Sequence, residues 1–160
     1  MSTTVVTQFV AAPADRVWGL LVDLGSRSAW LSTVDAVELV TPPPFAAGAI
    51  WRETHRMPEG DPVAEEFHVE SCEPGRRFVV TSPGRGADYR TTYAVTPVTA
   101  GRHRGGTLVA VEQEGHPRSR GGRVLEVVLG GLAARTAEGA IRQELADLAA
   151  AAESAGSRRR

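Results

Sequence analysis

The chain has 160 residues, of which 42% are hydrophobic and 23% charged, and its formal net charge is −1. This balance is typical of one soluble globular domain and excludes the strongly basic composition of many nucleic-acid-binding proteins. No apolar run approaches the length of a membrane span, and the N-terminus lacks the basic region of a signal peptide. We therefore expect a cytoplasmic protein with no membrane span and no nucleic-acid partner.

Two counts limit the chemistry further. The single Cys72 excludes an intrachain disulfide framework. All 18 basic residues are arginines. Schiff-base chemistry and phosphate loops that need a lysine are therefore excluded.

The first predicted elements are a strand from Thr3 to Val10 and two short helices between Ala11 and Trp30. Pro13 suits the first turn of a helix, because its missing N–H would have no partner there. One apolar stripe at helical spacing follows, formed by Val17, Leu20, Leu21 and Leu24.

Six more strands are expected after the helices, separated by turns rich in proline and glycine. Their predicted ranges are 34–40, 50–56, 63–72, 77–82, 87–98 and 107–114. The turn Glu73–Arg76 predicts a hairpin between two of them. Consecutive strands with short turns favour an antiparallel meander.

A long C-terminal helix is predicted after Pro117, where apolar residues recur at helical spacing up to Leu148. Three glycines interrupt the pattern, at 130, 131 and 139, and each costs a helix about 1 kcal/mol relative to alanine. We expect a need for space beside a sheet or a ligand to compensate. The predicted organisation is one domain over residues 1–154 and a flexible arginine-rich tail over 155–160.

Several short motifs resemble one known superfamily. They are Ala12–Trp18, Asp23-Leu24 followed by Ala29-Trp30-Leu31, Gly48, Glu73–Phe78 and Gly105-Gly106-Thr107. In this order and spacing the chain resembles the START/Bet v 1-like (SRPBCC, helix-grip) superfamily, and more narrowly its polyketide cyclase/dehydrase-like branch.

This resemblance implies an α+β helix-grip fold, in which a curved antiparallel sheet wraps around a long C-terminal helix and two short helices follow the first strand. It also implies an internal cavity for a small hydrophobic molecule, aromatic or polyketide-like. Three classes of function stay open: a cofactor-independent cyclase/aromatase, a non-catalytic carrier or sequestering protein, and a protein-interaction module of the co-chaperone or toxin-like kind. The expected partner is the small molecule, with an acyl-carrier protein as a further candidate, and the expected state is a monomer or homodimer.

Strand alternation selects the candidate catalytic pair. Trp51, Glu53 and His55 share one face of their predicted strand, and Arg52 and Thr54 share the other. Inside a cavity, Glu53 and His55 would serve as general base and acid for a cyclisation. The alternative places Glu53 and His55 on the solvated outer face.

The candidate ligand-binding residues follow from the same reasoning about faces, together with the stripe of the long helix. They are Trp30, Trp51, Phe67, Val69, Tyr89, Thr91, Tyr93, Leu125, Leu129 and Leu132. Phe67, Val69 and Ser71 are expected to share the inward face of their strand, opposite Glu66, His68 and Glu70. The latter three suit a solvated exterior better than a metal site, so neither a metal nor a cofactor is predicted. His103 and His116 are expected in exposed loops, and Cys72 is expected to be a buried, inert thiol.

Overall fold

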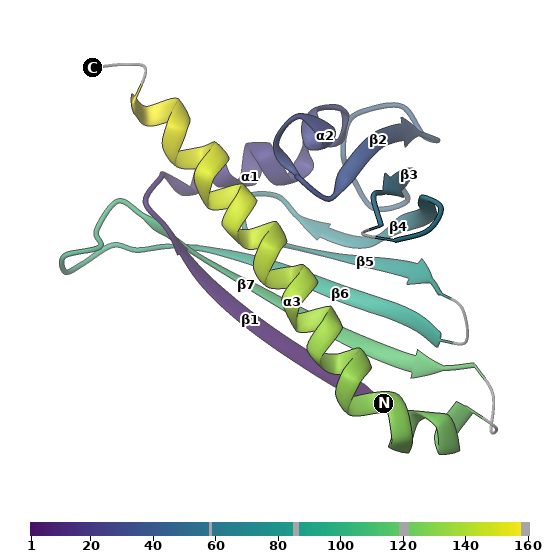
Figure 1. Cartoon of the computed structure of the whole chain (residues 1–160). Helices are drawn as coiled ribbons and strands as arrows, with labels where there is room; N and C mark the ends of the chain where they lie inside the picture. The colour runs from purple at the N-terminus through teal and green to yellow at the C-terminus, as the bar shows by residue number, and fades with distance from the viewer. Residues whose placement is uncertain (58, 85–86, 119–121, 158–160) are drawn as a thin grey trace.

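The computed structural model describes residues 1–57, 59–84, 87–118 and 122–157, without the side chains of 122–136, 155 and 157. Seven strands form one antiparallel sheet in the order β1-β7-β6-β5-β4-β3-β2 (Figure 1). Their bounds are β1 Ser2–Val10, β2 Val34–Leu39, β3 Ile50–His55, β4 Val63–Glu73, β5 Arg77–Pro83, β6 Ala87–Pro97 and β7 Thr107–Pro117. All seven predicted strands are therefore confirmed, with small shifts at their ends.

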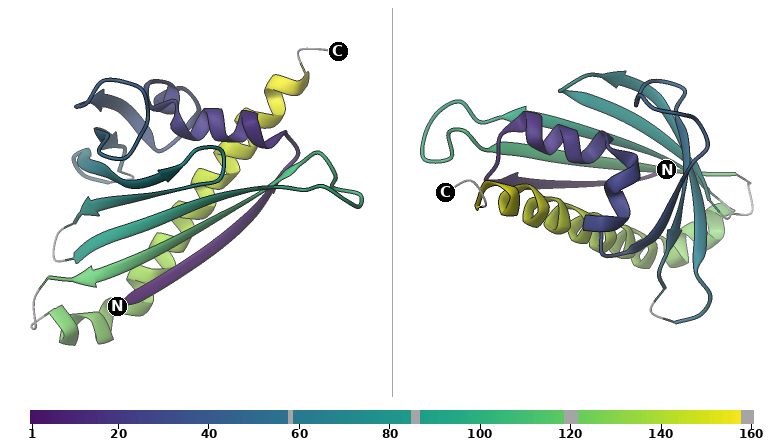
Figure 2. Two further views of the ribbon diagram at one scale, coloured as in Figure 1. Left: turned by 180° about the vertical axis from the view of Figure 1, so that it is seen from behind. Right: turned by 90° about the horizontal axis from the view of Figure 1, so that it is seen from above.

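The helices lie together on one face of this curved sheet (Figure 2). α1 spans Ala14–Val22, the short 3-10 helix η1 spans Leu24–Ser26, α2 spans Arg27–Trp30 and α3 spans Gly122–Ser157. α3 runs diagonally across the sheet, with β1 beside it (Figure 1). This arrangement confirms the predicted helix-grip fold.

The turn from β1 into α1 depends on Pro13. Its extended backbone conformation makes it the N-cap, and its carbonyl accepts the N–H groups of Arg16 and Val17. Val17 and Leu21 then lie fully buried against the sheet and α3. The proline and the apolar stripe therefore place α1, η1 and α2 over one end of the sheet.

The β4–β5 hairpin agrees with its turn residues but contains an irregularity that alternation could not predict. Gly75 has a φ of +77°, a conformation that glycine adopts without strain. A β-bulge between Val69 and Ser71 shifts the register by one residue. The expectation that Ser71 faces inward is therefore wrong: Ser71 is exposed, and Cys72 packs against the core instead.

The second half of α3 is fastened to the rest of the domain. Ile141, Leu145 and Leu148 are buried in the core. The Asp147 carboxylate accepts the backbone N–H of Ser32 at 2.9 Å and its hydroxyl at 2.6 Å. These contacts hold the loop after α2 against α3, which brings the two elements together above β3.

Two other expectations concern the long helix α3: the reason for its glycines and the position of the C-terminal tail. Gly139 is exposed, and no atom lies within 4 Å of the place where a Cβ would stand, so the expectation that it makes room for a neighbour is wrong there. The surroundings of Gly130 and Gly131 lie outside the described residues. The predicted tail begins inside α3, which extends to Ser157, and residues 158–160 lie outside the described part of the chain.

Candidate functional site

The interior of the domain contains a buried carboxylate on β3. Glu53 is 1% exposed and its side chain points to the helix side of the sheet. Its Oε1 accepts the Nε–H of Arg27 at 2.5 Å and the indole N–H of Trp51 at 2.9 Å. The alternative prediction, that Glu53 lies on the solvated outer face of the sheet, is therefore wrong.

Arg27 links three elements through one side chain. It belongs to α2, is 6% exposed, and contacts Glu53 on β3 and Glu144 on α3, the latter at 3.4 Å. Burial by itself would lower the pKa of Arg27, but the negative charges of Glu53 and Glu144 outweigh that effect and raise the pKa above its ordinary value. The guanidinium therefore stays charged inside the domain.

Tyr93, on β6, is the residue of the sheet that contacts Glu144. Its hydroxyl lies 3.1 and 3.2 Å from the two carboxylate oxygens of Glu144, to which it donates a hydrogen bond. Burial, and then the negative charge of Glu144, raise the pKa of Tyr93 well above its ordinary value. The phenol is therefore a permanent hydrogen-bond donor. We call Arg27, Glu53, Glu144, Tyr93 and Trp51 the Arg27 cluster.

His55 stands at the edge of this cluster. Its Nε2 lies 3.5 Å from Oε2 of Glu53 and 3.4 Å from Oε2 of Glu65, and its side chain is 25% exposed. Nε2 is itself buried and makes no hydrogen bond within the described residues. Ser82 donates a hydrogen bond of 2.6 Å to the other oxygen of Glu65. Of the predicted catalytic pair, the imidazole thus has a nitrogen free to bond, whereas Oε1 of Glu53 already accepts two hydrogen bonds.

The predicted ligand-binding residues on the strands lie on the helix side of the sheet. Trp51, Val69, Thr91 and Tyr93 are buried there, and Phe67 and Trp30 are partly buried against the core. Tyr89 is half-buried with its ring directly over Gly84, where an added Cβ would lie 2.6 Å from the ring. The side chains of Leu125, Leu129 and Leu132 lie outside the described residues, so the cavity that they are expected to border is not described on the α3 side.

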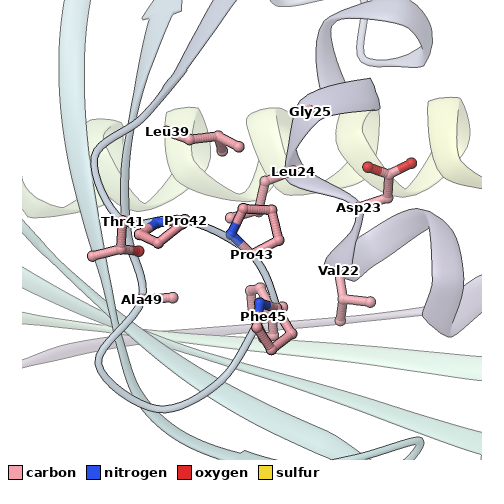
Figure 3. A pocket seen from close by; sticks show the side chains of 11 residues that line it. Val22, Asp23, Leu24, Gly25, Leu39, Thr41, Pro42, Pro43, Phe45 and Ala49 are labelled. Atoms are coloured by element: carbon pink, nitrogen blue, oxygen red, sulfur yellow. The ribbon is translucent and has the colours of Figure 1, made fainter.

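A separate apolar pocket of about 230 Å³ opens between the helices and the β2–β3 connection (Figure 3). Leu24, Pro43 and Phe45 are among the residues that line it. The Phe45 ring, which lines the pocket, lies 6.2 Å from the ring of Trp51, a member of the Arg27 cluster. The lining residues are Val22–Gly25, Leu39, Thr41–Phe45 and Ala49, and none of the predicted site residues is among them.

The other candidate side chains lie apart from the cluster. His68 contacts Glu66 at 2.7 Å, and Glu70 pairs with Arg90, all on the outer face of the sheet. Burial raises the pKa of the Cys72 thiol. His116 lies on β7, so its predicted place in a loop is wrong, although its side chain is exposed as expected.

Sequence reasoning missed Arg27 and Glu144. Arg27 is 26 residues from Glu53, and Glu144 is 117 residues from Arg27. Glu144 follows the apolar stripe of α3 as an ordinary polar position, and Arg27 sits in a four-residue helix. Neither position carries a sequence signal that distinguishes a buried ion pair from a solvated charge.

The geometry defines a helix-grip protein of the START type with a charged cluster in its interior. The chain belongs to the family described as "Polyketide cyclase / dehydrase and lipid transport", whose sequence profile matches residues 1–153. A search of curated proteins found no match. Within the described residues, no helix is both long and apolar enough to cross a membrane.

Three solved structures illustrate the likeness in fold. A START superfamily protein from Mycobacterium smegmatis is 13% identical with a TM-score of 0.74, over 95% of this chain and 97% of that one. The Zhui aromatase/cyclase from Streptomyces sp. R1128 is 17% identical with a TM-score of 0.70, over 95% and 93%. The di-domain ARO/CYC StfQ from the steffimycin biosynthetic pathway is 16% identical with a TM-score of 0.75, over 97% of this chain and 52% of that one.

Proposed function

We propose that this protein binds a small hydrophobic molecule, aromatic or polyketide-like, between the concave face of the sheet and α3. The observation that carries the proposal is the Arg27 cluster, which places charged side chains among buried residues that are mostly apolar in the described part of the chain. A buried ion pair contributes little to stability compared with a well-packed apolar core of similar volume. A role in orienting a bound molecule gives such a cluster a function, and family membership supports the same proposal.

The ligand would lie along the inner face of β3, β4 and β6. Phe67 stacks on Trp51 with ring centroids 5.2 Å apart, and Phe78 stacks on Tyr93 at 4.7 Å. Flat aromatic walls of this kind suit a flat aromatic guest, because offset stacking adds to the burial of apolar area. The polar end of the molecule would then reach the Arg27 cluster and His55.

A second, finer proposal is that the protein catalyses a cyclisation, and His55 favours it. A neutral imidazole can remove a proton from the carbon next to a ketone, and the resulting enolate carbon can attack a second ketone in the same molecule. The alkoxide formed takes the proton back from the imidazolium, and loss of water gives the unsaturated ring. Glu53 would stabilise the imidazolium formed in this step, since its Oε2 lies 3.5 Å from Nε2 while its Oε1 is held by Arg27 and Trp51.

Binding is tested first by native mass spectrometry of the protein from its own host, followed by denaturation to release any bound molecule. A stoichiometric aromatic or lipid ligand supports the proposed function. The purified protein is also dialysed against 2-naphthol, a small aromatic probe. If the protein retains neither a natural ligand nor the probe, a binding function is contradicted and the protein-interaction class is favoured.

Catalysis is tested with 1-phenylhexane-1,5-dione, which cyclises to 3-phenylcyclohex-2-enone and water, by following the absorbance of the conjugated product. His55→Gln should lower the rate by about 10²- to 10⁴-fold if His55 transfers the proton. His68→Gln is the matched control, because His68 lies on the outer face of the neighbouring strand. Equal rates for the wild type and His55→Gln would refute the catalytic proposal and leave the carrier function standing.

A further inference from the structure

A second buried nitrogen lacks a hydrogen-bond partner among the described residues. The indole Nε1 of Trp30, at the end of α2, is buried and makes no hydrogen bond within the part of the chain that the structure describes. Buried polar groups in proteins are nearly always hydrogen-bonded, because leaving one unpaired costs about 1–3 kcal/mol. An indole N–H is a donor only, so the group that satisfies it must be an acceptor.

Trp30 lies beside the Arg27 cluster. The Arg27 guanidinium carbon lies 5.6 Å from the centre of the Trp30 ring, and the same guanidinium binds Glu53. Val34, four residues after Trp30, pairs with His55 across β2 and β3. Both nitrogens therefore belong to residues that neighbour the Arg27–Glu53 ion pair, Trp30 through its ring contact with Arg27 and His55 through its approach to Glu53.

The charges around this end of the interior are unbalanced. Arg27 is the one permanent cation of the group, while Glu53, Glu65 and Glu144 contribute three carboxylates. Carboxylates therefore outnumber guanidinium groups three to one here, and one of the three, Glu65, has a side chain that is 34% exposed. An anionic ligand head beside the buried Glu53 would be repelled, because like charges interact strongly where little solvent screens them.

From these observations we propose that Trp30 and the charge of this region select the ligand: a neutral aromatic molecule that presents a hydroxyl or carbonyl oxygen to Trp30 Nε1, with carboxylic acids rejected. This inference rests on the proposed binding function and narrows its ligand class. The oxygen of a hydroxyl or carbonyl group can accept the indole N–H, and a hydroxyl can in addition donate its own proton to an acceptor. Fatty acids and other carboxylates, which are common hydrophobic ligands, are thereby disfavoured.

The test uses three probes of nearly equal shape at neutral pH: 2-naphthol, 2-methylnaphthalene and 2-naphthoate. Affinities are measured by equilibrium dialysis, which does not depend on tryptophan fluorescence. We expect 2-naphthol to bind about tenfold more tightly than 2-methylnaphthalene, and 2-naphthoate to bind least tightly. Trp30→Phe should abolish the advantage of 2-naphthol while both neutral probes still bind. Trp18→Phe should preserve the tighter binding of 2-naphthol, because Trp18 packs on Phe78, which is not a member of the Arg27 cluster.

The charge is tested with a matched pair of neighbouring residues. Glu65→Gln removes a carboxylate beside His55 and should tighten 2-naphthoate binding several-fold, whereas Glu66→Gln, on the outer face, should not. Circular dichroism confirms that each variant is folded. Equal binding of all three probes, or an unchanged 2-naphthol advantage in Trp30→Phe, overturns this inference and leaves the proposed function intact. Binding of none of the probes counts against both.

Discussion

Replacement of Arg27 by methionine tests directly whether the guanidinium compensates the buried carboxylate of Glu53. The substitution keeps a long apolar stem but removes the guanidinium that holds Glu53 and Glu144. Oε1 of Glu53 would then retain only the indole N–H of Trp51, while its carboxylate stays 1% exposed. Loss of one partner of a buried ion pair typically costs about 3–5 kcal/mol, because the other charge remains buried without compensation.

This cost is large against the total stability of a domain, about 5–15 kcal/mol. For a chain of this size each kcal/mol lowers Tm by about 2–4 °C, so Arg27→Met should lower Tm by about 6–20 °C. The free energy of unfolding is measured by urea denaturation followed by far-ultraviolet circular dichroism. Arg142→Met is the control, since Arg142 forms an exposed pair with Glu138 and should cost less than about 0.5 kcal/mol.

The double variant Arg27→Met/Glu53→Gln separates the ion pair from the loss of packing. Because it removes both charges, it should be less destabilised than the sum of the two single variants, by about 0.5–3 kcal/mol. Additive effects would show that Arg27 and Glu53 do not interact energetically. A loss below about 1 kcal/mol in Arg27→Met would show that Glu53 is not held as an uncompensated buried charge, and the reasoning about the cluster would be refuted.

Two further predictions concern the helix and the sheet. Gly139→Ala should raise the free energy of unfolding by up to about 1 kcal/mol, because the position is helical and exposed and no described atom lies within 4 Å of the added Cβ. Gly106→Ala should lower the free energy of unfolding, since the added Cβ would lie 2.5 Å from the Phe9 ring. Urea denaturation compares the two variants, and destabilisation by Gly139→Ala would contradict the structure of α3. Because burial raises the pKa of Tyr93, the unfolded chain ionises at this residue near pH 10 while the folded protein keeps the proton, so stability should fall as pH rises above about 10. Tyr93→Phe should show a smaller alkaline loss, measured as Tm against pH, and an equal loss in both proteins would contradict the burial of the phenol.

Local sequence patterns determined most of the fold. Alternation along the strands and the turn at Gly75 predicted the meander, because side-chain period and turn geometry are set by neighbouring residues. The same alternation placed Trp51, Glu53 and His55 on one face. The bulge beside Ser71 was not predictable, since it depends on how two strands pair rather than on the residues of either one.

Tertiary structure alone decided what surrounds Glu53. Its ion-pair partner Arg27 comes from α2, and the second carboxylate of the cluster, Glu144, comes from the middle of α3. An arginine in a short helix and a glutamate in a long one look solvated in sequence, because burial depends on the packing of elements more than a hundred residues apart. Periodicity and turns therefore determined the order of strands and helices, and the motifs shared with the START/Bet v 1-like superfamily indicated the helix-grip architecture. The packing of α2 and α3 over β3 decided which charges share its interior.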